Sequence, residues 1–262
     1  MDLKQITFDI IAIAKEAGNF IRQESAGFTT SKIEYKGLNN LVSYVDKESE
    51  KLIVAKLSAL LPQAGFITEE ETVNVTGEEF NWIVDPLDGT TNFIHGLPAY
   101  AVSIALQQKS ELVAGVVYEI SRDECFYAWK GGGAYLNDKP IRVTDNDTIP
   151  KSLIATGFPY YDFAKLEKYL NVFRELTQKC HGLRRFGSAA TDLAYVACGR
   201  FDGYFEYNLN SYDIAAGVVI VREAGGKTCN FSGGSELFNS REIVATNGKI
   251  EEPLLEVIGK HF

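Results

Sequence analysis

The sequence predicts a mixed α and β protein, with an α+β N-terminal half followed by an α/β C-terminal half. Two changes in the spacing of apolar residues carry this prediction. Helical spacing gives way to closely spaced strands near Trp82, and strands alternate with helices after Pro150. We place the halves at 1–148 and 149–262, and because no flexible linker separates them we expect them to pack as one unit.

The first half opens with two helices. Apolar residues recur every three or four positions in the first helix, where Asp2 and Gln5 offer a capping box. The second helix follows Asp46 and carries leucine and isoleucine side chains on one face. The period then changes, because 82–84 reads as a short strand and 101–143 contains several more strands joined by turns. This stretch predicts an antiparallel meander.

The second half alternates strands with helices. Strands are expected at 152–156, 183–186, 204–207 and 242–246. Helices are expected at 162–180, at 188–198, at 213–224 and after Pro253. Two of these helices carry end signals, since Ser188 is a favourable N-cap residue and Gly199 and Gly225 follow the last turns.

The composition excludes several classes of protein. Of the 262 residues 45% are apolar and 23% are charged, which is ordinary for a globular protein. No segment approaches the ~20 uncharged apolar residues of a membrane helix, and Asp2 stands where a secretory signal would be basic. We therefore expect a cytoplasmic protein with no membrane partner.

The charge balance is acidic. Lys and Arg number 26 against 35 Asp and Glu, which gives a formal net charge of −9. Nucleic acid is therefore not expected as a partner, because binders of the phosphate backbone need clustered positive charge. A small phosphorylated substrate is compatible with this balance if a bound cation supplies the positive charge. The four cysteines form no C-x-x-C pair, so we interpret them as reduced thiols.

The motif WIVDPLDGTTNF is the most informative pattern in the chain. Pro86 forces an extended or turn conformation on the residue before it, so Asp85 and Asp88 can converge where a buried strand ends. Gly89 allows close backbone approach, and a helix that starts near Thr90 would direct its free N–H groups at the same place. Carboxylates beside an anion cradle suit a Mg²⁺–phosphate site. The alternative is an ordinary turn built from Asp, Pro and Gly.

Further carboxylates accompany this motif. Glu69 and Glu70 follow an apolar pair and precede the strand, although a run of acids is usually a solvated loop. Asp213 begins an apolar helix, for which a plain N-cap is the alternative interpretation. The small residues from Ala215 to Gly217 keep that helix slim, so a ligand can approach its first turn.

These residues together match a known family. The segment 82–93 resembles the signature of the inositol monophosphatase family of Mg²⁺-dependent, lithium-sensitive phosphatases, and the Asp213 segment resembles its second signature. The segment 66–70 is similar to the family's acidic motif, and 187–190 is similar to its substrate loop. Glu206 lies seven residues before Asp213, as in the family pattern. The likeness extends over nearly the whole chain.

The resemblance implies a fold, a cofactor and a set of ligands. It implies a layered αβαβα sandwich of the sugar-phosphatase type, a homodimer, and two or three Mg²⁺ ions per subunit. The implied metal ligands are Glu69, Asp85, the carbonyl of Leu87, Asp88 and Asp213. Glu69 and Thr90 would be the catalytic residues, which orient the attacking water.

The resemblance also implies where the substrate lies. The implied substrate contacts are Leu87, Asp88, Gly89, Thr90, Gly187, Ser188, Ala189, Glu206 and Asp213. Asp46 and Lys36 resemble the upstream acid and lysine that lie near the site in this family. Tyr212 and Thr68 depart from the pattern, which commonly has Trp and Gly there, and these departures bear on substrate fit more than on metal binding.

The sequence therefore predicts a phosphatase that hydrolyses a small phosphate monoester, most simply myo-inositol monophosphate. Histidinol phosphate, fructose 1,6-bisphosphate and 3′-phosphoadenosine 5′-phosphate are alternative substrates. The acidic Glu206 favours a neutral, hydroxyl-rich alcohol over a second phosphate. A regulatory protein that uses this scaffold to contact the transcription machinery is an alternative of another class.

Overall fold

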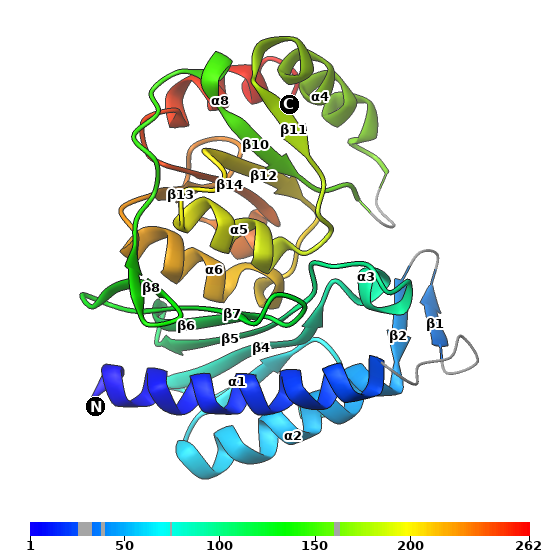
Figure 1. Cartoon of the computed structure of the whole chain (residues 1–262), viewed down its shortest axis with the longest axis vertical. Helices are drawn as coiled ribbons and strands as arrows, with labels where there is room; N and C mark the ends of the chain where they lie inside the picture. Colours follow the sequence, from blue (N-terminus) through cyan, green and yellow to red (C-terminus); the bar gives the residue numbers. More distant parts are fainter. Residues whose placement is uncertain (26–32, 38–39, 74, 160–162) are drawn as a thin grey trace.

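The protein is built from five layers, which alternate helices with sheets (Figure 1). The computed structural model describes residues 1–25, 33–37, 40–73, 75–159 and 163–262, and for 33–37 and 40–43 it describes the backbone alone. From one end to the other, Figure 1 shows a helix pair, a large sheet, a second helix pair, a smaller sheet and a third helix pair. The predicted αβαβα sandwich of mixed α and β class is confirmed.

The outermost layer of the first half holds two long helices. Helix α1 covers Leu3–Ser25 and α2 covers Tyr44–Leu60. As predicted, Asp2 caps α1, since its carboxylate accepts a hydrogen bond of 3.2 Å from the backbone N–H of Gln5. The prediction that α2 follows Asp46 was wrong, because Asp46 lies inside its first turn and its carboxylate is used elsewhere, as described below.

The large sheet has seven strands in sequence order. They are β3 (Gly65–Thr68), β4 (Phe80–Asp88), β5 (Ala101–Gln108), β6 (Glu111–Glu119), β7 (Glu124–Trp129), β8 (Gly133–Leu136) and β9 (Lys139–Ile141). Strands β3 and β4 are parallel and every later pair is antiparallel, which confirms the meander predicted for 101–143. A separate hairpin pairs β1 (Ile33–Gly37) with β2 (Asn40–Ser43).

Strand β4 is longer than the sequence suggested. The sequence predicts a short strand at 82–84 that ends beside Asp85, but the strand continues through Pro86 to Asp88, with a register irregularity against β5 between the two acids. An irregularity of this kind accommodates a proline, which cannot donate a ladder hydrogen bond. Gly89 then leads into the short helix α3 (Thr90–Ile94), close to the predicted start.

The smaller sheet belongs to the second half. Its order is β11 (Gly182–Arg184), β10 (Leu153–Thr156), β12 (Gly203–Tyr207), β14 (Glu242–Thr246) and β13 (Lys227–Cys229). The first three strands are parallel, and β14 is antiparallel to both of its neighbours. A 3-10 turn (Ile149–Lys151) precedes β10. Outside this sheet, α4 (Leu166–Lys179) and α8 (Glu251–Gly259) form the last layer, and the short α7 (Leu237–Ser240) precedes β14.

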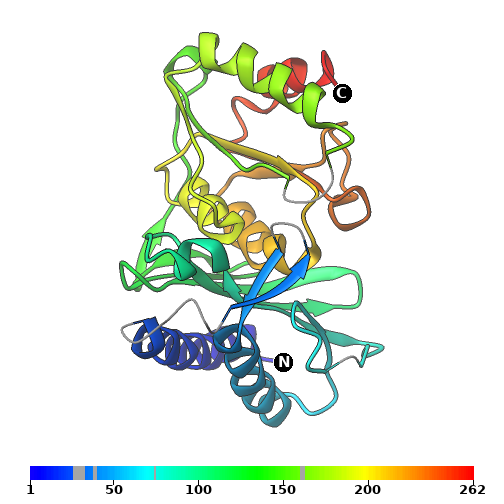
Figure 2. The same ribbon diagram turned by 90° about the vertical axis from the view of Figure 1, so that its right-hand side faces the viewer.

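Helices α5 (Ala189–Ala197) and α6 (Ser211–Glu223) form the central layer between the two sheets (Figure 2). Ser188 caps α5 as predicted, because its side chain accepts a hydrogen bond from the N–H of Thr191. Helix α6 begins earlier than predicted, with Asn210 as N-cap, so Asp213 is its third residue and not a plain N-cap. Gly115 permits its close packing, since a Cβ there would lie 2.6 Å from the carbonyl oxygen of Ala216.

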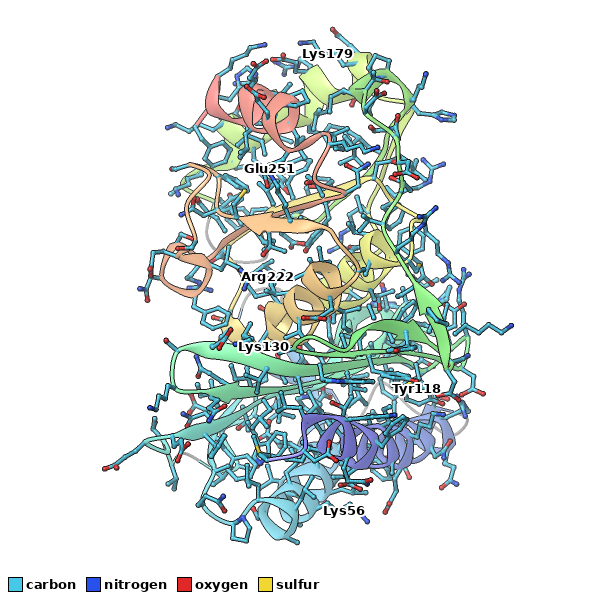
Figure 3. All side chains as sticks on the ribbon, turned by 90° about the vertical axis from the view of Figure 1, so that its left-hand side faces the viewer. Lys56, Tyr118, Lys130, Lys179, Arg222 and Glu251 are labelled. Atoms are coloured by element: carbon cyan, nitrogen blue, oxygen red, sulfur yellow. The ribbon has the colours of Figure 1, made fainter. Side chains whose placement is uncertain are left out.

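Side chains fill the spaces between all five layers (Figure 3). One core lies between α1, α2 and the large sheet, a second surrounds α5 and α6, and a third lies beneath α4 and α8. The second core joins residues from both predicted halves, so α6 is fixed against the sheet that carries β4. Within the described part of the chain, no helix combines the length and hydropathy that crossing a membrane requires.

Candidate active site

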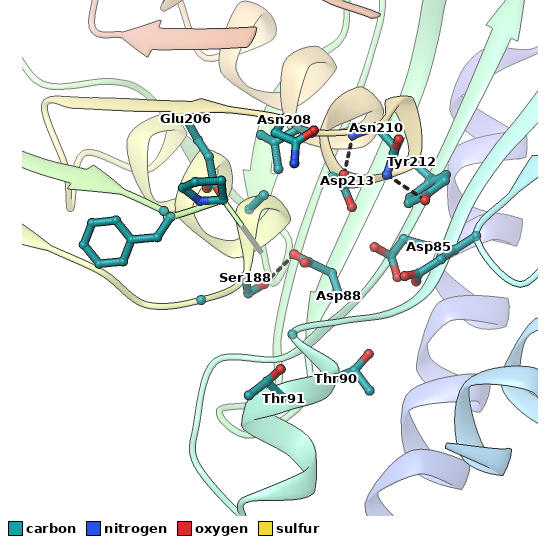
Figure 4. A pocket seen from close by; sticks show the side chains of 18 of the residues that line it. Asp85, Asp88, Thr90, Thr91, Ser188, Glu206, Asn208, Asn210, Tyr212 and Asp213 are labelled. Carbon is teal, nitrogen blue, oxygen red and sulfur yellow. Dashed lines mark hydrogen bonds between the residues drawn. The ribbon is translucent and has the colours of Figure 1, made fainter. Parts of the chain in front are cut away.

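Three aspartates from distant segments meet in one cleft. Oxygen atoms of Asp85, Asp88 and Asp213 lie within 4.8 Å of one another. The first two come from the end of β4 and the third from the first turn of α6, and Figure 4 shows all three carboxylates turned toward a common centre. The fold thus brings together carboxylates that are more than a hundred residues apart in the sequence.

Each aspartate is oriented by hydrogen bonds. The Asp85 carboxylate accepts one of 3.0 Å from the N–H of Leu87, and Asp213 accepts one of 2.5 Å from the N–H of Asn210. One oxygen of Asp88 accepts from the Ser188 hydroxyl at 2.6 Å and from the N–H of Ala190 at 2.7 Å. The start of α5 therefore holds one oxygen of Asp88.

Burial and crowding make the charges of this cluster unfavourable. Burial raises the pKa of Asp88 to about 6, although the Ser188 hydroxyl and the amides of α5 act in the opposite direction. Burial, followed by the neighbouring carboxylates, also raises the pKa of Asp85, Asp213 and Glu69 well above the ordinary range. Glu69 borders the cluster, because its carboxyl is in hydrogen-bond contact with that of Asp85.

The chemistry of these donors fits a hard divalent cation. Mg²⁺ prefers carboxylate and carbonyl oxygens, and the cleft offers the carboxylates of Glu69, Asp85, Asp88 and Asp213 together with Leu87 at its wall. A cation among them would offset the repulsion that raises their pKa values. The residues present therefore fit Mg²⁺.

Thr90 is held beside the cluster by a residue of α2. Its hydroxyl donates to the Asp46 carboxylate at 2.8 Å and lies 3.0 Å from the carbonyl oxygen of Leu87. Asp46 is only 1% exposed, so α2 places a buried acceptor behind the start of α3. The side chain of Lys36, which the sequence placed near the site, lies outside the described residues.

The turn before α3 requires glycine. Gly89 has a φ of 93°, and a Cβ at this position would lie 2.8 Å from the carbonyl oxygen of Ala99. The amide of Asn92 then joins this turn to the substrate loop, because it donates to the carbonyl oxygens of Ala99 at 2.7 Å and Phe186 at 2.8 Å. The motif of β4 and the loop before α5 are thus tied together.

Glu206 lies on the side of the cleft away from Thr90 (Figure 4). The Tyr204 hydroxyl donates to its carboxylate at 2.5 Å, and burial raises the pKa of Glu206 to about 7. Gly157 leaves the space that this carboxylate fills, since a Cβ there would lie 2.0 Å from the carboxyl carbon. Gly187 and Ala189 also line the cleft, whereas the Ser188 hydroxyl contacts Asp88 and Thr191.

Comparison with known proteins assigns the chain to a family. The model of the inositol monophosphatase family matches residues 2–261. The chain belongs to the inositol monophosphatase family. It is 40% identical to an inositol-1-monophosphatase of Mesorhizobium japonicum over 253 residues, which cover 96% of this chain and 95% of that protein. It is 41% identical to the Nus factor SuhB of Salmonella typhimurium over 246 residues, which cover 94% and 92%.

Solved structures of family members have the same fold. The extragenic suppressor protein suhB of Bartonella henselae matches with a TM-score of 0.94 at 40% identity, covering 98% of this chain and 100% of that one. The inositol monophosphatase of Anabaena matches with a TM-score of 0.87 at 33% identity, covering 100% and 98%. These relatives therefore bear names of two kinds, one enzymatic and one regulatory.

The sequence did not identify the whole lining of the cleft, which encloses about 150 Å³. The lining residues that it missed are Thr91, Gly157, Phe158, Pro159, Arg185, Tyr207, Asn208, Leu209 and Asn210. Arg185 could have been found, because it lies two residues before the substrate loop that matches the family pattern. Thr91 lies in α3, inside the motif 82–93, and the others come from strand ends and loops whose residue types carry no spacing signal.

Proposed function

We propose that this member of the inositol monophosphatase family is a Mg²⁺-dependent phosphomonoesterase that hydrolyses a small phosphate monoester, most simply myo-inositol monophosphate. The convergence of Asp85, Asp88 and Asp213 is the observation that carries this proposal. With Glu69 and the carbonyl of Leu87, they would hold two or three Mg²⁺ ions. Bound Mg²⁺ would supply charge neutralisation on the phosphate oxygens and lower the pKa of water.

Thr90 and Glu69 would position the attacking water. The Thr90 hydroxyl directs its hydrogen toward the Asp46 carboxylate and the Leu87 carbonyl, so its oxygen is left as an acceptor. A water in the cleft can donate one hydrogen to Thr90 and another to Glu69. Its lone pair is then free to face the phosphorus, which an in-line displacement requires.

The rest of the cleft would hold the substrate. The N–H groups of Gly89 and Thr90, at the start of α3, would donate to the phosphate oxygens. Glu206 lies on the other side and would accept hydrogen bonds from hydroxyls of the alcohol, alongside Gly187 and Ala189. An alcohol that carries several hydroxyls would satisfy this acceptor better than a second phosphate.

A panel of phosphate esters, assayed with Mg²⁺ and with or without lithium, tests the proposal. We expect turnover of inositol monophosphate that requires Mg²⁺ and that lithium inhibits. If the enzyme instead prefers histidinol phosphate, fructose 1,6-bisphosphate or 3′-phosphoadenosine 5′-phosphate, the proposed substrate is wrong but the proposed Mg²⁺-dependent hydrolysis stands. Absence of Mg²⁺-dependent hydrolysis across the panel would reject the enzymatic function. The homodimer and the cytoplasmic location stay predictions, and light scattering would test the former.

A regulatory role is a second candidate, because a relative of 41% identity is named a Nus factor. Such a role would use the outer surface and not the cleft. A pull-down of RNA polymerase and its factors from the source organism, with wild-type protein and with Asp88→Asn, tests it. Capture by both forms would support a binding role independent of catalysis, and capture by neither would reject it.

A further inference from the structure

One face of α2 contacts three segments that surround the cleft. Asp46, Ser49 and Glu50 are all buried, although two of them carry a carboxylate. Asp46 accepts from Thr90, and the Ser49 hydroxyl donates to the carbonyl oxygen of Pro86 at 3.3 Å. Glu50, one turn after Asp46, contacts the third segment, which is the loop that follows β3.

The Glu50 carboxylate is saturated by donors from this loop. One oxygen accepts from the N–H of Glu70 at 2.8 Å. The other accepts from the N–H of Thr72 at 2.8 Å and from the Thr72 hydroxyl at 2.7 Å. Glu50 is 0% exposed, so these bonds replace all its contact with water.

We propose that Glu50 is a positioning residue that holds Glu69 at the metal cluster, an inference that rests on the proposed function. Glu50 does not line the cleft and touches no reacting atom. It binds the backbone immediately after Glu69, whose own N–H donates to the carbonyl oxygen of Val84 on β4 at 3.3 Å. The loop is therefore fixed on both sides of the Glu69 side chain.

The loop needs such an anchor for two reasons. Glu69 faces the carboxylates of Asp213, Asp46 and Glu70, and their charges would favour its movement toward solvent. The chain also turns sharply here, because Glu71 has a φ of 52°, in the left-handed region that a side chain disfavours. Hydrogen bonds from the residues on either side of Glu71 to one buried carboxylate stabilise this turn.

The direct test is Glu50→Gln, which keeps the shape but places an amide N–H₂ against backbone and hydroxyl donors. We expect Mg²⁺ affinity, measured by calorimetry on the full chain without substrate, to fall by about 10-fold to 100-fold, as for other residues that orient a metal ligand. Saturating Mg²⁺ should largely restore kcat for p-nitrophenyl phosphate, and KM should change less than twofold. The matched control is Glu48→Gln, an exposed neighbour on α2 that pairs with Lys51, and it should bind Mg²⁺ normally.

Thr72→Val is the second variant, because it removes one donor to Glu50 and keeps the charge. It should give a loss of Mg²⁺ affinity between wild type and Glu50→Gln, and it decides the matter if Glu50→Gln does not fold. If both variants melt at lower temperature but bind Mg²⁺ with unchanged affinity, Glu50 has a purely structural role and the inference is overturned. If Glu50→Gln does not fold, the same result for Thr72→Val alone overturns it. Wild-type protein that binds no Mg²⁺ would instead reject the proposed function on which the inference rests.

Discussion

Asp88 joins the two halves of the molecule through its carboxylate. One oxygen accepts from Ser188 and Ala190 at the start of α5, and the residue also belongs to the cluster with Asp85 and Asp213. An amide can reproduce the first role, because its carbonyl oxygen accepts the same bonds. It cannot reproduce the second, since the negative charge is lost.

Asp88→Asn is therefore expected to separate folding from catalysis. The melting temperature without Mg²⁺ should stay equal to or above that of wild type, while kcat/KM falls by more than about tenfold, a loss above ~1.4 kcal/mol of transition-state stabilisation. Asp147→Asn, in the segment before β10, is the control and should leave kcat/KM unchanged. If the variant retains more than a tenth of wild-type kcat/KM, Asp88 is not a metal ligand.

Glu206 is predicted to act on the alcohol and not on the phosphate. Glu206→Gln should reduce kcat/KM for inositol monophosphate and leave p-nitrophenyl phosphate nearly unchanged, because the aryl ester has no hydroxyls to offer. Comparison of the two substrates on one enzyme preparation measures this difference. Equal losses on both esters would contradict the placement of Glu206.

The raised pKa of Glu206 should make KM for inositol monophosphate depend on pH. Burial raises this pKa to about 7, so the carboxyl becomes a full acceptor only as the pH rises through that value. We expect KM for inositol monophosphate to decrease between pH 6 and about 8 in wild type. The Glu206→Gln protein should show no such decrease, and a parallel profile in both proteins would assign the titration to another group.

Among the elements, the turn from β4 into α3 requires glycine for two reasons at once. Gly89→Ala combines a left-handed backbone, which costs roughly 1–2 kcal/mol for an L-residue, with a Cβ 2.8 Å from the carbonyl oxygen of Ala99. Gly96 offers a matched control, because its φ is 65° and a Cβ there meets nothing within 4 Å.

Urea unfolding of both variants tests this turn. Gly96→Ala should lose only the backbone term of about 1 kcal/mol, and Gly89→Ala should lose clearly more than 2 kcal/mol, since backbone atoms must move. Gly89→Ala should also lose most of its activity. Similar losses of unfolding free energy in both variants would mean that the turn tolerates a side chain.

The elements also show what a sequence can predict. Apolar periodicity located α1, which buries one continuous face. Short apolar runs bounded by turns located the strands of the meander, both faces of which are buried. The sequence pattern misplaced the end of β4, since Pro86 usually ends a strand and the irregularity that accommodates it depends on pairing with β5. It also left out β13, a three-residue strand that is stabilised by β14 more than by its own pattern.

The candidate site also contains residues that the sequence could predict and residues that it could not. The carboxylates of Asp85, Asp88 and Asp213 could be proposed because their motifs match the family, and the fold brings them together. The role proposed for Glu50 could not be read from the sequence. It depends on the contact between the loop after β3 and α2, two segments that only the tertiary structure brings together.

At the scale of the whole molecule, residues of the large sheet and of the central helix layer together line the cleft, and Figure 1 shows these two layers next to each other. Asp85 and Asp88 belong to the first half and Asp213 to the second, and α6 packs against the large sheet through Gly115. Any separation of the layers would therefore move Asp213 away from the other two carboxylates. The stability of the molecule and its affinity for Mg²⁺ should accordingly be linked.

This linkage predicts how the melting temperature depends on pH and Mg²⁺. Burial raises the pKa of Asp88 from 3.8 to about 6 and that of Glu206 from 4.5 to about 7. Each group therefore contributes stability that is present below its unfolded pKa and is lost as the pH rises through its folded pKa. Without Mg²⁺, the melting temperature should therefore fall between about pH 4 and about pH 7.

Millimolar Mg²⁺ should reverse that fall, because a ligand that binds only the folded state stabilises it by mass action. The increase in melting temperature should grow with pH, since ionised carboxylates bind the cation best. Scanning calorimetry at several pH values, with NaCl of matched ionic strength as the control, measures both effects. Melting curves that respond equally to MgCl₂ and NaCl would mean that the carboxylates of the cleft hold no specific metal ion.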